Sequence, residues 1–221
     1  MKLGLLALAA AALLSGGCGS GPHGTATLWV TRDRGARVLL TRKVPAGLTA
    51  MQALDRVADI KTRYGGRFVQ AIDGVSGSLS ARRDWFYFIN GYEADRGAAE
   101  YRLRDGDVEW WDYRSWGGRS DEPVVVGAFP EPFLHGYGGR RRPAYVVGPV
   151  PSDIAKRVHG RVVAAGAPIP RSANVLTCGT SRSEARFRFD GGVAGDPAVV
   201  TVDCATLSTH PDDLRFHYSL P

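Results

Sequence analysis

The chain has 221 residues, of which 44% are hydrophobic, and a formal net charge of +6 at pH 7. Beyond the first seventeen residues, no segment approaches the length of a transmembrane span. The basic charge comes without a recognisable nucleic-acid-binding motif, so we expect no nucleic acid partner.

The chain begins with the pattern of a secretory signal. Lys2 provides a basic start, residues 3–14 are Leu and Ala with one Gly, and small residues 15–17 precede Cys18. The apolar run would rise roughly 18 Å as a helix, against about 30 Å of bilayer hydrocarbon. We therefore predict that residues 1–17 are a cleaved signal peptide.

Cys18 distinguishes lipid anchoring from plain secretion. Residues 14–18 resemble the bacterial lipobox, although Ser15 stands where that motif usually has Leu. We predict that Cys18 is lipidated, that residues 18–24 form a tether, and that the protein is held at the outer face of a bacterial membrane. The alternative is plain secretion with a spare thiol. Lipidation leaves Cys178 and Cys204 to form a disulfide in an oxidising compartment; two buried thiols are the alternative.

Residues 25–116 contain the more legible of two predicted domains. Thr49, with Gln52 three residues later, predicts the capping box at the start of a helix. Asn90-Gly91 predicts a tight hairpin turn, because both positions require positive φ. Strands are predicted at residues 25–31, 37–44, 68–72, 85–89 and 108–113. This order of elements indicates a small α+β fold of the β-grasp type.

Residues 124–221 form the second predicted domain, after a turn-rich boundary near residues 117–123. A helix is predicted from Ser152 to about Ala165, with a buried stripe at Ile154, Ala155, Val158 and Val162. Strands are predicted at residues 124–126, 145–147, 174–178, 185–189, 198–204 and, less regularly, 214–220. The expected fold class is therefore α+β throughout, with a β-grasp-like domain followed by a second small α+β domain.

The first domain resembles the transcobalamin-like C-terminal family of bacterial surface proteins, over about residues 25–116. The motifs occur in the family's order: Thr49, Ala50 and Leu54; Phe68, Ile72 and Gly74; Trp85, Tyr87, Asn90 and Gly91; Gly97, Tyr101 and Leu103; and Asp105-Gly106-Asp107. In the vertebrate carriers this module closes over cobalamin that a separate helical domain also holds, and this chain has no room for that helical domain. The resemblance thus implies the fold more strongly than it implies cobalamin as a ligand.

Aromatic residues occupy both faces of the predicted strands, whereas one helix covers only one face. Trp85 and Tyr87 alternate with Phe86 and Phe88, and Trp111 and Tyr113 alternate with Trp110, with Trp116 just beyond. The surplus rings either pack against the second domain or bind a ligand such as a corrin-like ring or a sugar. The residues predicted to bind a ligand are Trp85, Tyr87, Asn90, Trp111, Tyr113 and Trp116. The proline-rich segment 129–133 is expected to line the same cleft as Trp111 and Trp116.

Nothing in the sequence indicates familiar catalysis, and we predict neither an enzyme nor a bound cofactor or metal. The segment 74–78 lacks the final glycine of a nucleophile elbow, and the five histidines lack metal-ligand spacing. We expect a non-catalytic lipoprotein that binds a small molecule, a cell-wall ligand or a partner. The alternative is a structural or interaction lipoprotein of the cell envelope without a small-molecule site.

Overall fold

The computed structural model describes residues 24–117, 122–179, 183–210 and 212–218. The predicted signal peptide, Cys18 and all of the tether except Gly24 lie outside the described residues. None of the described helices has the length and apolar character that crossing a bilayer requires.

The first sheet is a mixed, five-stranded sheet. Its strands lie in the order β2 (Arg37–Pro45), β1 (Thr25–Arg32), β8 (Val108–Ser115), β6 (Arg83–Ile89) and β7 (Tyr92–Glu93). β1 and β8 are parallel, and the other neighbours are antiparallel. Asn90 and Gly91 both adopt positive φ between β6 and β7, as the hairpin prediction requires.

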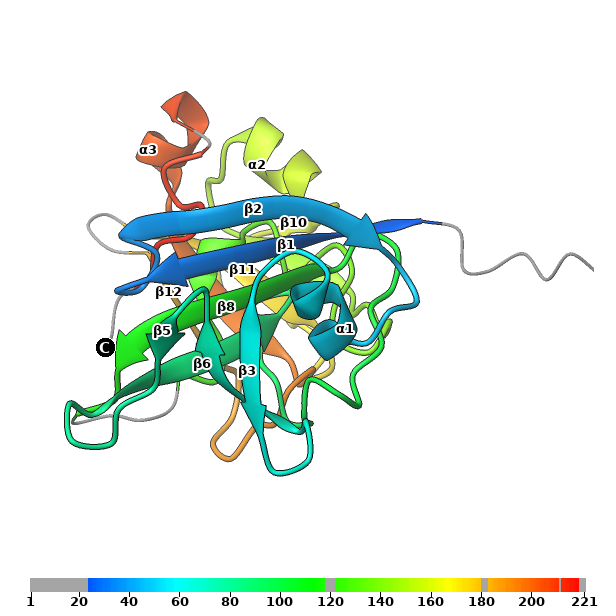
Figure 1. The fold of residues 1–221 in the computed structure, drawn as a ribbon. Coiled ribbons are helices and arrows are strands. Elements are labelled where there is room, and N and C mark those ends of the chain that lie inside the picture. Colours follow the sequence, from blue (N-terminus) through cyan, green and yellow to red (C-terminus); the bar gives the residue numbers. More distant parts are fainter. Residues whose placement is uncertain (1–23, 118–121, 180–182, 211, 219–221) are drawn as a thin grey trace, which may run out of the picture.

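One face of the first sheet carries helix α1 (Ala50–Asp55) and a small three-stranded sheet (Figure 1). The small sheet consists of β3 (Ile60–Arg63), β4 (Phe68–Ile72) and β5 (Val75–Ser76). Helix α1 begins after Thr49 with both hydrogen bonds of the capping box, which confirms that prediction.

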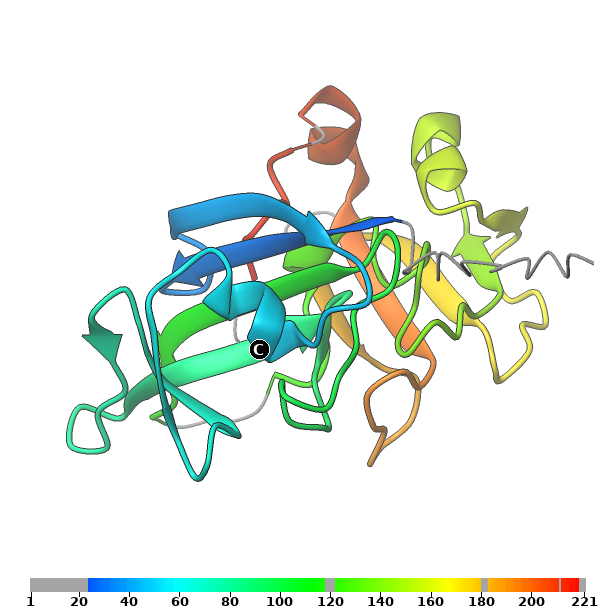
Figure 2. The ribbon, with the colours of Figure 1, turned by 45° about the vertical axis from the view of Figure 1, so that its right-hand side comes forward.

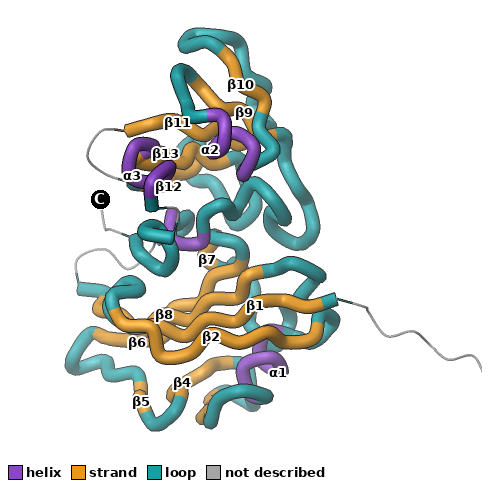
Figure 3. The backbone as a smooth tube through the Cα atoms, turned by 90° about the horizontal axis from the view of Figure 1, so that it is seen from above, coloured by secondary structure: helices purple, strands orange, loops and turns teal. Residues whose placement is uncertain are grey.

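The second sheet follows in the rest of the chain and lies beside the first (Figures 2 and 3). Its order is β10 (Arg161–Val163), β9 (Ala144–Val147), β11 (Asn174–Gly179), β13 (Ala198–Asp203) and β12 (Glu184–Phe187). Only β12 runs antiparallel to its neighbour. Short helices α2 (Ser152–Arg157) and α3 (Cys204–Thr209) lie on the same side of this sheet, and the 3₁₀ turn η1 (Val126–Ala128) lies between the two sheets.

The expected α+β class is wrong, because the molecule is mostly β: 40% of it is strand and only 11% is helix. The helix predicted from Ser152 to about Ala165 ends at Arg157. His159 then adopts positive φ, and residues 161–163 leave as strand β10. Of the predicted buried stripe, Ile154, Ala155 and Val158 are buried, but Val162 is 54% exposed.

Smaller differences occur in both halves of the chain. Residues 124–126 form an isolated bridge and the start of η1 rather than a strand. No strand forms in residues 214–218, the described part of the last predicted strand. Strand β3 and helix α3 were not predicted. A strand of four residues with one partly buried side chain leaves no alternating pattern to recognise.

Two hydrophobic cores separate the aromatic residues of the first sheet by face. The core beneath α1 and the small sheet contains Trp85, Trp111 and Tyr113. The core between the two sheets contains Trp29, Phe88 and Trp110, together with residues of η1 and of the second sheet. The surplus aromatics of one face therefore pack between the sheets, as the packing alternative expected.

Cys178 and Cys204 form a disulfide, which confirms that pairing. The bond joins the end of β11 to the start of α3 and closes a loop with a sequence separation of 26 residues. It therefore ties α3 to the parallel part of the second sheet.

We predict that the double substitution Cys178→Ala/Cys204→Ala lowers the free energy of unfolding by about 3 kcal/mol, because an open loop of this length gains chain entropy when it unfolds. Denaturant titration of the variant and the oxidised parent measures the difference. Mass spectrometry of unreduced protein after alkylation is the control. Alkylation of both Cys178 and Cys204 in the unreduced parent would show that the bond does not form.

Candidate functional site

A cleft of about 510 Å³ lies between the small sheet and the uncovered edge of β6. One wall is the start of β4 with the turn before it, at Arg67, Phe68 and Val69. Residues 84–87 of β6 form the opposite wall, and the segment after β7 closes one end. Trp111 and Trp116, from β8 and just beyond it, complete the lining.

β6 is open here because its second partner strand is short. β7 pairs only with Phe88 and Ile89, and the Ala94 N–H then donates to the Tyr87 carbonyl at 3.1 Å. At the other end, Ser78 and Arg83 form a bridge. Within the described residues, no strand pairs with this side of β6 between those points, and the cleft occupies that gap.

The aromatic rings of the cleft are held by specific contacts. The Trp85 indole N–H donates to the Val75 carbonyl at 2.9 Å. Tyr87 and Trp111 are stacked, with ring centroids 4.9 Å apart. The Trp111 indole N–H donates to Glu109 Oε1 at 2.7 Å. These contacts fix the rings before any ligand arrives, which lowers the entropic cost of binding.

Four of the six predicted ligand-binding residues line the cleft: Trp85, Tyr87, Trp111 and Trp116. Tyr113 does not line it but packs on Trp85, with ring centroids 5.2 Å apart. Asn90 also does not line it. Its buried side chain donates to Asp107 and to the Gly136 carbonyl, and accepts from the Val108 N–H. Asn90 therefore anchors the hairpin to a later loop.

The prediction that segment 129–133 lines the cleft is wrong. Phe129 and Phe133 are buried in the core between the sheets, together with Trp110. Strand alternation places Trp110 and Trp111 on opposite faces of the first sheet. A segment that packs on Trp110 therefore lies on the face away from Trp111.

Sequence reasoning did not identify the polar rim of the cleft, which includes Arg67 and Asp84. Burial raises the pKa of the Asp84 carboxyl, and the hydrogen bond from the Trp85 N–H opposes that shift. Arg67 comes from the turn between β3 and β4, and β3 was not predicted. The sequence signal for this side chain was therefore only the Gly65-Gly66 pair before it.

Two buried oxygen atoms next to the cleft-lining rings have no hydrogen-bond partner among the described residues: the Tyr87 hydroxyl and Glu109 Oε2. Burial raises the pKa of Tyr87 above its usual range. Burial also raises the pKa of Glu109 well above its usual range, and the bond from Trp111 only partly opposes this. Glu109 is fully buried, so its neutral form is favoured.

The arrangement suits binding by ring contact. The described residues contain no group of three His, Cys, Asp or Glu side chains that could hold a metal ion. A second hollow, of about 620 Å³, lies beside α2 and has no Phe, Tyr or Trp in its lining. The cleft on β6 is therefore our candidate site.

We predict that Glu109→Gln reduces the loss of stability that the protein undergoes as pH rises. The unfolded glutamate loses its proton near pH 4.3, whereas the buried side chain keeps it to higher pH. The neutral side chain therefore contributes its full stabilisation to the folded protein below the pKa of the unfolded glutamate. As the pH rises from there towards the pKa of folded Glu109, the free energy of unfolding falls by about 1.4 kcal/mol per pH unit. Gln keeps the acceptor for Trp111 but does not titrate.

Denaturant titrations of the parent and Glu109→Gln over a series of pH values measure this slope. Exposed Glu100, replaced by Gln, is the matched control. Equal slopes in the parent and Glu109→Gln would contradict the prediction.

Comparison with known families identifies one matching domain. Residues 47–115 match the model of a domain of unknown function, DUF4430. The match covers well under half of the chain and falls inside the 25–116 segment predicted as a transcobalamin-like module. A search of the curated proteins found no match.

Two solved structures have a limited likeness to the chain. The first is a candidate metal-binding protein from Ruminococcus gnavus: 16% identity, TM-score 0.35, 42% of this chain and 98% of that one covered. The second is haptocorrin in complex with Cbi: 16% identity, TM-score 0.35, 41% of this chain and 24% of that one covered. The chain thus spans about a quarter of haptocorrin's length. The DUF4430 segment contains every cleft-lining residue except Trp116.

Proposed function

We propose that the protein is a non-catalytic binding lipoprotein, tethered through Cys18 to the outer face of a bacterial membrane. In this proposal, the cleft on β6 holds a ligand with a flat or ring-shaped apolar surface, of the corrinoid or glycan class. The observation that carries the proposal is the cleft itself, where Trp85, Tyr87, Trp111 and Trp116 converge at the open edge of a sheet.

The chemistry of the lining supports this class of ligand. Aromatic faces bind rings and sugars through a large contact area at low entropic cost. Arg67 and Asp84 at the rim offer a hydrogen-bond donor and an acceptor for polar groups at the ligand's edge. Pockets with an apolar lining and a few convergent polar groups are the usual form of small-molecule sites.

A second function has specific support from burial. Trp111 is 4% exposed and Tyr113 is 6% exposed, so most of each ring packs within the protein. In this alternative the protein is a structural or interaction lipoprotein of the envelope, and the aromatics stabilise the fold. The first proposal expects the partly exposed ring of Trp116 to contact a ligand, whereas the alternative expects it to have no ligand.

We predict that Trp116→Ala weakens ligand binding roughly three- to tenfold and leaves the stability near that of the parent, because Trp116 is a partly exposed ring at the rim. Calorimetric titration with cobalamin and with cell-wall glycan fragments measures the affinity. Trp29→Phe is the matched control, since Trp29 lies in the other core. If no ligand of either class binds, and Trp111→Ala costs only stability, the structural alternative is supported and the ligand proposal is wrong.

The anchor has an independent test in a bacterial expression host. We predict that the parent incorporates labelled fatty acid and sediments with membranes, because the acyl chains hold it in the bilayer. Cys18→Ser should remove the label, and with it the sedimentation that persists in high salt, because salt screens any contact between basic side chains and headgroups. Cys178→Ser/Cys204→Ser is the control and should retain the label. Labelling that survives Cys18→Ser would rule out this anchor.

A further inference from the structure

Two turns of the first half of the chain present large apolar side chains to solvent. Leu79 is 81% exposed and Tyr64 is 78% exposed, the highest values among the large hydrophobic side chains of the described residues. Phe68, 40% exposed, packs edge-on against Tyr64 with ring centroids 6.2 Å apart. Scattered exposed hydrophobics are ordinary, but here they occupy the tips of turns.

The turns are held by their own backbone, so the tips are presented in a defined conformation. Tyr64 adopts positive φ and is followed by Gly65 and Gly66, also at positive φ. The second turn is closed by the Ser78–Arg83 bridge and by the Arg82 N–H, which donates to the Leu79 carbonyl. Binding through preformed turns requires little ordering of the chain.

All charged side chains on these turns are basic. Residues 61–68 contain Lys61, Arg63 and Arg67, and residues 77–83 contain Arg82 and Arg83; neither segment contains Asp or Glu. Arg83 is paired with Asp33. We call residues 61–68 and 77–83 together the tip surface.

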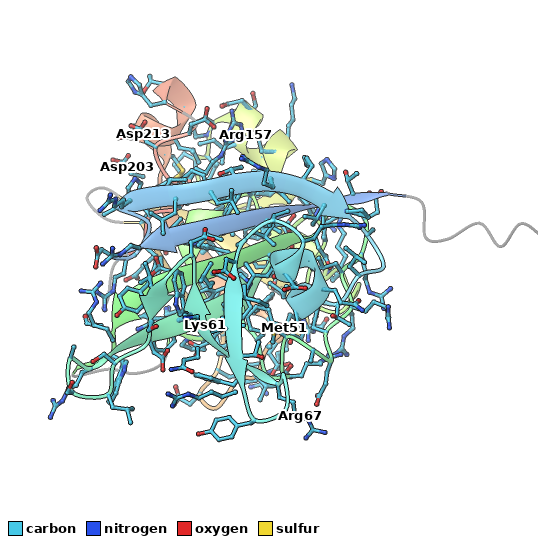
Figure 4. The ribbon with its side chains drawn as sticks, viewed as in Figure 1. Met51, Lys61, Arg67, Arg157, Asp203 and Asp213 are labelled. Carbon is cyan, nitrogen blue, oxygen red and sulfur yellow. A yellow bond between two sulfur atoms is a disulfide. The ribbon has the colours of Figure 1, made fainter. Side chains whose placement is uncertain are left out.

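The two turns project from the same side of the molecule. Figures 1 and 2 both show them below the first sheet, on the side away from β2. In Figure 4, Arg67 lies at the end of the β3–β4 hairpin and Lys61 further up the same hairpin. The turn between β12 and β13 points the same way in both ribbon views and carries Phe189 and Val193, which are 49% and 57% exposed.

This combination of groups discriminates between classes of partner. An acidic polymer would be attracted by the basic side chains but would leave Tyr64 and Leu79 in water. A hydrophobic pocket of another protein would bury those side chains, but it would use the surrounding cations only if acidic residues lined its rim. An anionic phospholipid surface uses both, because headgroups attract Lys and Arg while Tyr and Leu enter the interfacial region.

We propose that the tip surface binds the anionic surface of a phospholipid bilayer. The contact is additional to any lipid on Cys18 and goes beyond the proposed function, since it does not require a ligand in the cleft. Arg67 and Phe68 also line the cleft. Docking through the tips therefore orients the cleft with its β4 wall next to the lipid surface.

Vesicle sedimentation tests the proposal, using the chain from residue 18 onward with Cys18→Ser, so that no acyl chain contributes. This protein should bind vesicles of phosphatidylcholine and phosphatidylglycerol in equal parts more tightly than vesicles of phosphatidylcholine alone. Added salt should weaken the binding, because it screens the headgroup charge.

Substitutions separate the two components of the binding. Tyr64→Ser/Leu79→Ser should weaken partitioning into the mixed vesicles by about tenfold or more, through the lost apolar contact. Lys61→Gln/Arg82→Gln should weaken it by roughly thirtyfold, with little effect on pure phosphatidylcholine. Val38→Ser/Val162→Ser is the matched control: these residues are 46% and 54% exposed on strands outside the tip surface.

Three outcomes would overturn the proposal. The first is an absence of binding to mixed vesicles. The second is equal loss in the control variant, which would show unspecific adsorption. The third is loss on replacing Lys61 and Arg82 but none on replacing Tyr64 and Leu79, which would indicate a site for soluble polyanions. Calorimetric titration of the same variants with cobalamin and cell-wall glycan fragments tests the cleft independently. A failure of vesicle binding is thereby distinguished from a failure of the proposed function.

Discussion

Strand β8 is buried along almost its whole length on both faces, and the rest of the structure depends on covering both. Its alternation places Trp111 and Tyr113 toward α1 and the small sheet, and Trp110 toward the second sheet. A single short helix could not remove both sets of rings from water. The second sheet therefore buries the face of β8 that carries Trp110, and α1 with the small sheet buries the face that carries Trp111 and Tyr113.

The buried polar side chains of β8 connect distant segments of the chain. Asp112 accepts hydrogen bonds from the Thr31 hydroxyl at 2.6 Å and the Tyr218 hydroxyl at 2.7 Å. It also accepts from the backbone N–H of Arg34 in the turn after β1. A buried carboxylate is tolerated only when its oxygens are hydrogen-bonded, so these bonds specify how the C-terminal segment meets the first sheet.

The cleft exists because the edge of the first sheet along β6 is only partly covered. β7 is too short to pair with the whole of β6, and the small sheet approaches this edge without pairing there. The rings of Trp85, Tyr87 and Trp111 are thus packed on their inner sides and reach the cleft on their outer sides. The same side chains therefore contribute to the core and to the candidate site, which is why burial alone does not separate binding from packing.

Local chemistry was sufficient to predict the parts of the fold that depend on neighbouring residues. The capping box at Thr49 and the Asn90-Gly91 turn are formed by groups within a few positions of one another, and both occur. Strand alternation likewise determined which aromatics share a face. The cysteine count predicted the Cys178–Cys204 pair, although its place between β11 and α3 required the structure.

Tertiary contacts decided what local patterns left open. Residues 161–163 follow a helical pattern, but they pair as β10 with β9, because backbone bonds to a neighbouring strand outweigh a weak helical preference. Likewise, whether segment 129–133 or β4 would lie beside Trp111 depended on which segment covers which face of the sheet. The aromatic residues of the site were thus evident in the sequence. Their partners, Arg67 and Asp84, and the cleft itself arose only from contacts between segments distant along the chain.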